Sequence, residues 1–127
     1  MKHLLLLASL CALLYGCASQ PPYTDTGTPG QIKVIAFYDD NKNGVMDGAE
    51  AGTQTKVAIS QEVSCPPSGH PSWLDTDTAG TYTFQDLKPG KYCIISLSAM
   101  GYTTKVAPVV YVSSDRVTTV AFGLVRP

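Results

Sequence analysis

The chain has 127 residues, of which 9 are basic and 10 are acidic, so its formal net charge is −1. This near-neutral balance gives no electrostatic footprint for nucleic acid or for an anionic membrane surface, and we expect no nucleic-acid partner. The low charged fraction of 15%, with many Thr, Ser, Gly and Val residues, is typical of a secreted β-protein, and the length suits one domain rather than two.

The N-terminal sequence indicates secretion. Lys2 and His3 precede an apolar run from Leu4 to Tyr15, which is too short to span a bilayer and is typical of a secretory signal peptide. The run ends in a motif similar to the lipobox of bacterial lipoproteins, Leu14-Tyr15-Gly16-Cys17. That resemblance implies cleavage before Cys17 and a diacylglycerol on its sulfur, so residues 1–16 are expected to be a lipoprotein signal peptide.

The expected lipid anchor attaches the mature chain to a membrane of the cell envelope. Ala18 follows the cysteine, and in a Gram-negative lipoprotein such a residue is compatible with passage to the outer membrane. The alternative is an ordinary signal peptide cut between Cys17 and Gln20. Residues 17–30 are polar, turn-forming and proline-containing, so we expect a flexible, lipidated tether there. The folded domain would then occupy residues 31–127.

A strand followed by an acidic loop opens this domain. Ile32 to Tyr38 is an almost continuous apolar run, short enough for a buried strand. It leads directly into a loop with oxygen-bearing side chains at positions 1, 3, 5, 9 and 12 and glycine at position 6, the pattern of an EF-hand-type calcium loop. These residues are Asp39, Asn41, Asn43, Asp47 and Glu50, with Gly44 at the turn.

The chemistry of this loop predicts a Ca²⁺ site. Calcium takes about six to eight oxygen ligands, and alternate side chains of a tightly wound loop converge on one centre. Val45, at position 7, would contribute its main-chain carbonyl, and Glu50 would close the site with both carboxylate oxygens. The alternative is a solvated turn between two strands.

The rest of the chain has β patterns. Lys56 to Val63 alternates, which puts Val57, Ile59 and Val63 on one face. The segment from Cys65 to Trp73 contains three prolines and is expected to be a loop.

The acidic segment 75–80 is expected to be a turn, and in the strand that follows Tyr82 and Phe84 share one face. Its carboxylates, Asp75 and Asp77, could instead bind a second ion, although a turn is the better interpretation.

Three further strands are expected in the C-terminal part. Lys91 to Ala99 carries apolar residues on both faces, with Tyr92 and Ile94 on one side and Cys93, Ile95 and Leu97 on the other. Thr103 to Val112 is interrupted by Pro108 and therefore predicted at an edge, and in Arg116 to Val125 the core positions are Val120, Phe122 and Leu124. Short strands at this spacing predict an all-β fold, a seven-stranded antiparallel β-sandwich.

The cysteines indicate a disulfide. Cys11 leaves with the signal peptide and Cys17 is the expected lipid site, so Cys65 and Cys93 remain to pair in an oxidising compartment. A metal or redox site with His70 is the alternative, but the spacing matches no zinc or CxxC pattern.

Two motifs in order carry a resemblance to a known family. The calcium-type loop is followed by the segment Asp75-Thr76-Asp77-Thr78-Ala79-Gly80-Thr81-Tyr82-Thr83-Phe84-x-x-Leu87-x-Pro89-Gly90-x-Tyr92. This order resembles the SdrD B-like repeat, a relative of the Cna B-type domains of bacterial surface proteins. The resemblance implies a prealbumin-like sandwich that calcium makes rigid, with Asp39, Asn41, Asn43, Asp47, Glu50 and the Val45 carbonyl as ligands.

These observations predict a non-enzymatic, calcium-stabilised envelope lipoprotein that serves as a structural or interaction module of the adhesin type, with an unidentified protein or glycan partner. The alternative is a glycan- or peptide-binding module that uses the Cys65 to Trp73 loop together with Tyr102 or Tyr111, with Trp73 as the contact residue. An enzyme is not expected, because His70 is the only histidine after cleavage and no Ser or Cys pairs with it by a recognised spacing.

Overall fold

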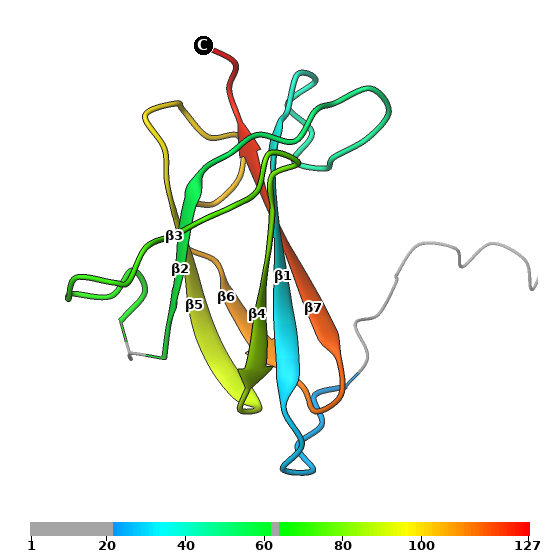
Figure 1. Cartoon of the computed structure of the whole chain (residues 1–127), viewed down its shortest axis with the longest axis vertical. Coiled ribbons are helices and arrows are strands. Elements are labelled where there is room, and N and C mark those ends of the chain that lie inside the picture. The colour runs from blue at the N-terminus through cyan, green and yellow to red at the C-terminus, as the bar shows by residue number, and fades with distance from the viewer. Residues whose placement is uncertain (1–21, 62–63) are drawn as a thin grey trace, which may run out of the picture.

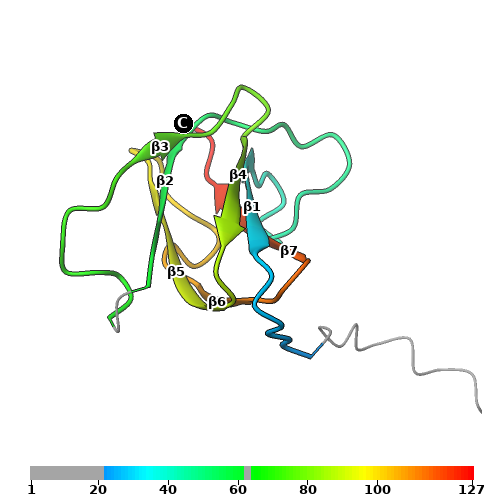
Figure 2. The same ribbon diagram turned by 60° about the horizontal axis from the view of Figure 1, so that its bottom comes forward.

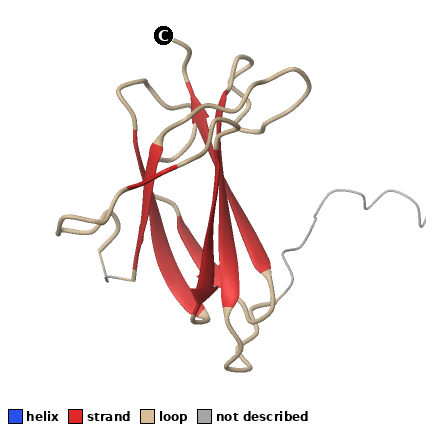
Figure 3. Cartoon of the chain, viewed as in Figure 1, coloured by secondary structure: helices blue, strands red, loops and turns tan. Residues whose placement is uncertain are grey.

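The computed structural model describes residues 22–61 and 64–127 and contains strands and loops only in these ranges (Figure 3). The predicted signal peptide, Cys17 and Val63 therefore lie outside the described residues. None of the described residues forms a helix long and apolar enough to cross a membrane. The strands are β1 (Gly30–Tyr38), β2 (Lys56–Ser60), β3 (Leu74–Asp75), β4 (Thr81–Leu87), β5 (Gly90–Leu97), β6 (Val109–Val112) and β7 (Val117–Leu124).

The strands form two sheets that pack as a sandwich, which confirms the predicted fold class (Figures 1 and 2). One sheet has the order β4-β1-β7 and the other the order β3-β2-β5-β6. All pairs are antiparallel except β1 and β7, which run parallel from Gln31 opposite Val117 to Tyr38 opposite Leu124. The parallel pair arises because β7 follows a strand of the opposite sheet and so reaches β1 by a crossover rather than a hairpin.

The main core lies between the sheets and follows the predicted alternation. Val57 is buried with Ile59 packed beside it, and Tyr82 packs with Phe84 at a ring-centroid distance of 4.8 Å. From β7, Val120 and Phe122 enter the same core. The remaining buried members of this cluster are Ile32, Val34, Tyr92, Ile94 and Val112.

A second, smaller apolar cluster covers the outer face of the β2–β5 pair. Cys93 and Ile95 of β5 are buried there with Ala58 and Ala107, so β5 is buried on both faces as its sequence predicts. Leu97 is the exception, because it lies at the end of the strand and is 52% exposed.

Two strands, β6 and β3, differ most from the sequence prediction. β6 lies at a sheet edge, as the proline predicts, but it begins only at Val109, directly after Pro108. The chain before it covers the end of β7 instead, because Thr103 N donates to Gly123 O at 2.9 Å and Val125 N to Gly101 O at 2.8 Å. The short strand β3 also lies where the sequence predicts only loop and turn.

The N-terminal segment departs from the predicted tether. Residues 22–29 lie against the β6–β7 turn rather than extending freely. Thr24 N donates to Ser113 Oγ at 3.1 Å, and Thr26 N donates to Ser114 Oγ at 2.9 Å. The main chain adds two bonds, from Ser114 N to Thr24 O and from Asp115 N to Pro29 O. The sequence patterns miss this docking because its partners are some 90 residues away and carry only small hydroxyl side chains.

Candidate metal centre

The predicted calcium loop lies at the end of the sandwich where β1 and β7 finish, beside the C-terminus (Figure 1). Asp39 follows β1 directly, and its main-chain N–H donates to Leu124 O at 3.0 Å. The parallel β1–β7 pair therefore fixes the first residue of the loop, while the following residues leave the sheet.

Asp39 is the anchor of the loop and is only 2% exposed. Its Oδ1 accepts the N–H of Asn43 at 3.1 Å, and its Oδ2 accepts the N–H of Gly44 at 2.8 Å and the hydroxyl of Thr103. Gly44 adopts the left-handed φ of 77° that the turn requires, as its position in the motif predicts.

The electrostatics of Asp39 favour the charged form. Burial alone would raise the pKa of this carboxyl. Hydrogen bonds from the Thr103 hydroxyl and from the main-chain N–H groups of the loop outweigh burial, so the pKa lies below its ordinary value of 3.8. The carboxylate is thus held ionised and in a fixed orientation.

A glycine of β7 makes room for this arrangement. A Cβ atom at Gly123 would lie 2.2 Å from Thr103 Oγ1 and 3.0 Å from Asp39 Oδ2. The main-chain N–H of Gly123 also donates to Thr104 Oγ1 at 3.1 Å. Gly123 is therefore part of the site, although the calcium motif does not include it.

Glu50 closes the loop onto its own beginning through hydrogen bonds, and its role as a bidentate ligand stays a prediction. Its Oε1 accepts the N–H groups of Asp40 at 2.9 Å and Asn41 at 3.4 Å. Its Oε2 accepts the N–H of Asp47 at 3.1 Å. Both carboxylate oxygens thus face the loop.

Asp47 is held by the two asparagines of the motif. Asn41 Nδ2 lies 3.1 Å from Asp47 Oδ1, and Asn43 Nδ2 lies 2.7 Å from Asp47 Oδ2. The side-chain oxygens of the same asparagines accept main-chain N–H groups two residues onward, from Asn43 and Val45. All five predicted ligand side chains therefore belong to one hydrogen-bonded loop.

The donor set fits a hard divalent cation in its chemistry, because it consists of three carboxylates, two amides and a main-chain carbonyl. Across residues 22–61 and 64–127, no three Asp, Glu, His or Cys side chains come close enough together to hold a metal ion by themselves. Instead, the amide NH₂ groups of Asn41 and Asn43 supply the partial positive charge that Asp47 requires. A cation would take over this role, with the amide oxygens turned toward it.

The sequence patterns do not identify two neighbours of the loop. Thr103 contacts Asp39 from a distant segment, and Arg126 holds Asp40 through two bonds of 2.9 Å. The Arg126 guanidinium also lies over the Tyr38 ring, 4.5 Å from its centroid. The Arg126 hydrogen bond lowers the pKa of Asp40. No spacing rule signals these contacts, because they depend on how the C-terminal segment returns to the loop.

Residues 77–80 of the second acidic segment form a turn, as expected, whereas Asp75 ends strand β3. Asp77 Oδ1 accepts the N–H of Thr81 at 2.8 Å, and its Oδ2 accepts the Thr81 hydroxyl at 2.8 Å. These bonds lower the pKa of Asp77. Asp75 pairs with Lys56 at 3.0 Å on the exposed face. Both carboxylates thus have partners that explain their presence without an ion.

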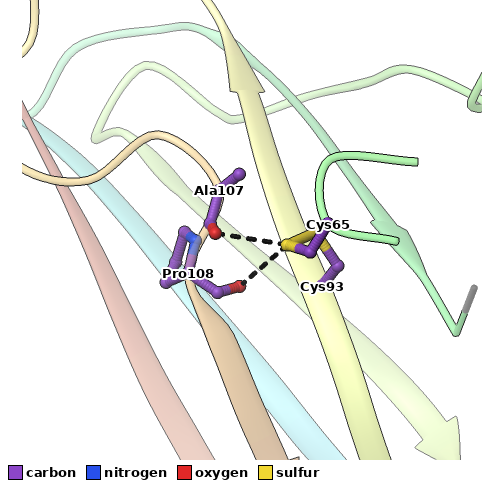
Figure 4. The surroundings of a disulfide bond; sticks show 4 residues. All are labelled: Cys65, Cys93, Ala107 and Pro108. Atoms are coloured by element: carbon purple, nitrogen blue, oxygen red, sulfur yellow. Dashed lines mark hydrogen bonds between the residues drawn. A yellow bond between two sulfur atoms is a disulfide. The ribbon is translucent and has the colours of Figure 1, made fainter. Parts of the chain in front are cut away.

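The predicted disulfide between Cys65 and Cys93 is confirmed, and it holds the loop after β2 onto β5 (Figure 4). The carbonyl oxygen of Ala107 points at Cys65 Sγ from 3.2 Å. Trp73 is half-buried and packs with Cys65 against the outer apolar cluster. Trp73 therefore packs under the loop, and the partner-binding role that the sequence offers for it stays a prediction.

Comparison with known proteins connects this architecture to a family. The family model for the SdrD B-like domain matches residues 30–116. Colossin-A of Dictyostelium discoideum is 32% identical over 85 residues, which are 66% of this chain and 1% of colossin-A. The chain thus spans about a hundredth of that relative.

Two pilin structures are similar to this chain. The minor pilin GBS52 of Streptococcus agalactiae gives a TM-score of 0.54 at 14% identity, over 79% of this chain and 45% of that one. The major pilin subunit BcpA of Bacillus cereus gives 0.49 at 13% identity, over 79% and 31%. The likeness to GBS52 shows the shared sandwich fold.

Proposed function

The chain belongs to the SdrD B-like domain family, and on that premise we propose that it is a non-enzymatic, calcium-stabilised cell-envelope lipoprotein that acts as a structural or interaction module of the adhesin type. GBS52, which shares the sandwich, is described as a minor pilin, and this supports a surface or envelope role without catalysis. The lipobox-like motif at Cys17 supports attachment to a membrane by lipid.

The observation that carries the calcium part of this proposal is the fixed, ionised Asp39 at the end of β1. The side chains of Asp39, Asn41, Asn43, Asp47 and Glu50 and the main-chain carbonyl of Val45 would hold the ion. When bound, calcium supplies two positive charges that offset the three carboxylates. Asp39 and Glu50 already orient the two ends of the loop, which reduces the ordering that binding would require.

The placement of the loop supports a mechanical role. The N-terminal segment enters beside the start of β1, whereas the loop and the C-terminus lie at the opposite end of the long axis (Figure 1). An anchor at the N-terminus therefore puts the loop at the end that projects from the membrane. Because the loop contacts β1, β7 and the C-terminal segment, ordering it stiffens that end of the module.

Thermal unfolding with calcium and with chelator tests the metal. A ligand that binds only the native state stabilises it by about 2.7 kcal/mol at a hundredfold excess over its dissociation constant. We expect calcium to raise the unfolding midpoint of the wild type, and Asp47→Asn and Glu50→Gln to abolish the rise. An equal midpoint with calcium and with chelator would refute the calcium-stabilised module.

The lipid is tested separately. The protein is extracted from the membrane fraction of cells that express the full chain, and its intact mass is measured. We expect the mass of a chain that begins at Cys17 and carries a diacylglycerol. An unmodified chain cut elsewhere would show an ordinary secreted protein and would leave the calcium result intact.

A further inference from the structure

An exposed apolar patch lies at the end of the sandwich opposite the metal loop. Tyr23, Tyr111 and Val117 are 50%, 58% and 56% exposed, although each is large and apolar. The rings of Tyr23 and Tyr111 meet edge-on with centroids 6.0 Å apart. Tyr111 and Val117 also line one hollow between the edges of β6 and β7. We call Tyr23, Tyr111 and Val117 the basal patch.

The basal patch lies where the N-terminal segment joins the domain. Thr24 and Thr26 are hydrogen-bonded to Ser113 and Ser114, so the chain direction just after Pro22 is fixed beside the patch. Cys17 lies five residues before Pro22, and a fully extended chain of that length spans at most about 18 Å. A membrane anchor at Cys17 therefore keeps the patch close to the bilayer surface.

The chemistry of the patch fits a membrane interface rather than a strongly charged surface. Tyrosine has an apolar ring and a polar hydroxyl, and aromatic residues of this kind gather at the level of lipid headgroups. Lys91 lies opposite Tyr111 in the β5–β6 register, and Arg116 precedes Val117. The exposed acids Asp25 and Asp115 offset these two cations, so attraction to anionic lipid contributes little.

We propose that the basal patch rests on the lipid bilayer, with Tyr23, Tyr111 and Val117 in contact with the interface, so that the sandwich stands on the membrane with its metal loop projecting. Because the anchor already holds the domain within a short distance of the bilayer, the effective concentration of lipid at the patch is high. A weak affinity of the patch for lipid is therefore sufficient to keep them in contact. This inference rests on the proposed membrane anchoring, and its test is therefore designed to work whether or not cells attach a lipid.

The test uses the mature chain from residue 17, which retains every described residue. Cys65 and Cys93 are bonded to each other, so Cys17 supplies the free thiol for coupling to maleimide-headgroup lipid in phosphatidylcholine vesicles. In a Trp73→Phe background, Tyr111→Trp places an indole in the patch. We expect its emission to shift to the blue on coupling and to be quenched by lipids brominated near the headgroup.

Two matched variants distinguish contact of the basal patch with lipid from mere proximity of the domain to the vesicle surface. Lys88→Trp places the indole at the same end of the sandwich outside the patch, and Leu97→Trp places it on the same sheet at the opposite end. Neither should be quenched. Equal quenching of Tyr111→Trp and Lys88→Trp, or quenching of none, would overturn the proposal. A blue shift of Tyr111→Trp that grows with protein concentration without vesicles would assign the patch to a second copy and also overturn it.

A readout on the natural side chains complements these variants. Tetranitromethane nitrates exposed tyrosines, and its products are located by peptide mass spectrometry. Coupling to vesicles should protect Tyr23 and Tyr111 several-fold and leave Tyr102, which pairs with Leu124 near the metal loop, unchanged. Unchanged nitration of Tyr23 and Tyr111 would contradict lipid contact. The intact mass from cells tests natural lipidation independently, so the two failures are distinguishable.

Discussion

The hydroxyl of Thr103 donates a hydrogen bond to Oδ2 of Asp39, although the two residues are 64 positions apart. This contact links the first residue of the metal loop to a segment that no ligand motif includes. Because Gly123 gives both side chains their space, three distant parts of the chain meet at one carboxylate. The conformation of the loop thus depends on contacts with distant segments as well as on the sequence of the loop itself.

Thr103→Val should disturb the loop without touching a proposed ligand. The variant keeps the shape of the side chain but removes the donor, so the pKa of Asp39 should rise and calcium affinity should fall. Carboxyl-carbon NMR titration and calorimetry measure the two effects. Thr119→Val, at an exposed position of β7, is the control and should change neither the pKa of Asp39 nor the calcium affinity. A Thr103→Val protein with unchanged affinity would show that this contact is dispensable.

Gly123→Ala tests the space beside Asp39. The added methyl would overlap Thr103 Oγ1 and press on the Asp39 carboxylate, so we expect a loss of about 1–3 kcal/mol in the free energy of unfolding, typical of overpacking. Chemical denaturation gives the value. Gly101→Ala is the matched control, because its added methyl would meet only Val125 side-chain atoms at 3.6 Å or more. Equal losses of unfolding free energy in Gly123→Ala and Gly101→Ala would argue against crowding of Thr103 and Asp39 by the added methyl.

The pH dependence of stability should reflect Asp77. Its main-chain and side-chain bonds to Thr81 lower its pKa in the folded protein below 3.8. A lowered folded pKa contributes stability that is fully present above the unfolded value and is lost as the pH falls through the folded value. Stability should therefore fall as the pH drops below about 4.

Asp77→Asn isolates this contribution, because asparagine still accepts a hydrogen bond but does not titrate. Urea denaturation between neutral and acid pH should show a shallower decline for this variant than for the wild type. Asp115→Asn, on an exposed turn, controls for the loss of one negative charge. An Asp77→Asn curve parallel to that of the wild type would contradict the assignment.

The Cys65–Cys93 bond should be a major stabilising element. It closes a loop with a sequence separation of 28, and the chain-entropy model assigns such a loop about 3.5 kcal/mol. The double variant Cys65→Ala/Cys93→Ala should lose a comparable amount in urea denaturation, and adding reductant should not weaken it further. A loss below about 1 kcal/mol would mean that the outer cluster holds the loop without the bond.

Trp73→Ala distinguishes packing from partner binding. Trp73 is half-buried against the outer cluster, so we expect a loss of about 2 kcal/mol, less than a fully buried tryptophan gives. Leu74→Ala is the neighbouring control and should cost under about 1 kcal/mol, because Leu74 is 37% exposed. Unchanged stability of Trp73→Ala, together with lost retention in a glycan or protein pull-down, would favour the binding module instead.

Local pattern was sufficient to predict the strands other than β3, the position of the loop and the disulfide. The alternation around Val57 and Phe122 fixes which faces are buried, and Gly44 fits the turn because only its backbone adopts that conformation easily. Glu50 hydrogen-bonds both ends of the loop, and the metal-ligand role that its spacing predicts stays a prediction.

The remaining features depend on contacts between distant segments. Arg126 reaches Asp40 only because the C-terminal segment returns to the loop, and Thr24 docks on Ser113 only because β6 and β7 are joined there. The predicted strand from Thr103 begins six residues later, because Gly101 and Thr103 bond to the edge of β7 instead. These contacts depend on which unpaired main-chain N–H and C=O groups meet in the folded chain. The hydrophobic periodicity of a short segment therefore does not predict them.

Isothermal titration with the wild type, Asp39→Asn and Asp40→Asn measures whether the loop from Asp39 to Glu50 binds calcium. Asp39 and Asp40 are adjacent, but only Asp39 turns into the loop, whereas Asp40 pairs with Arg126. We predict one calcium per chain for the wild type and for Asp40→Asn, and none for Asp39→Asn. Absence of binding to the wild type at millimolar calcium, or equal binding to Asp39→Asn, would contradict the account.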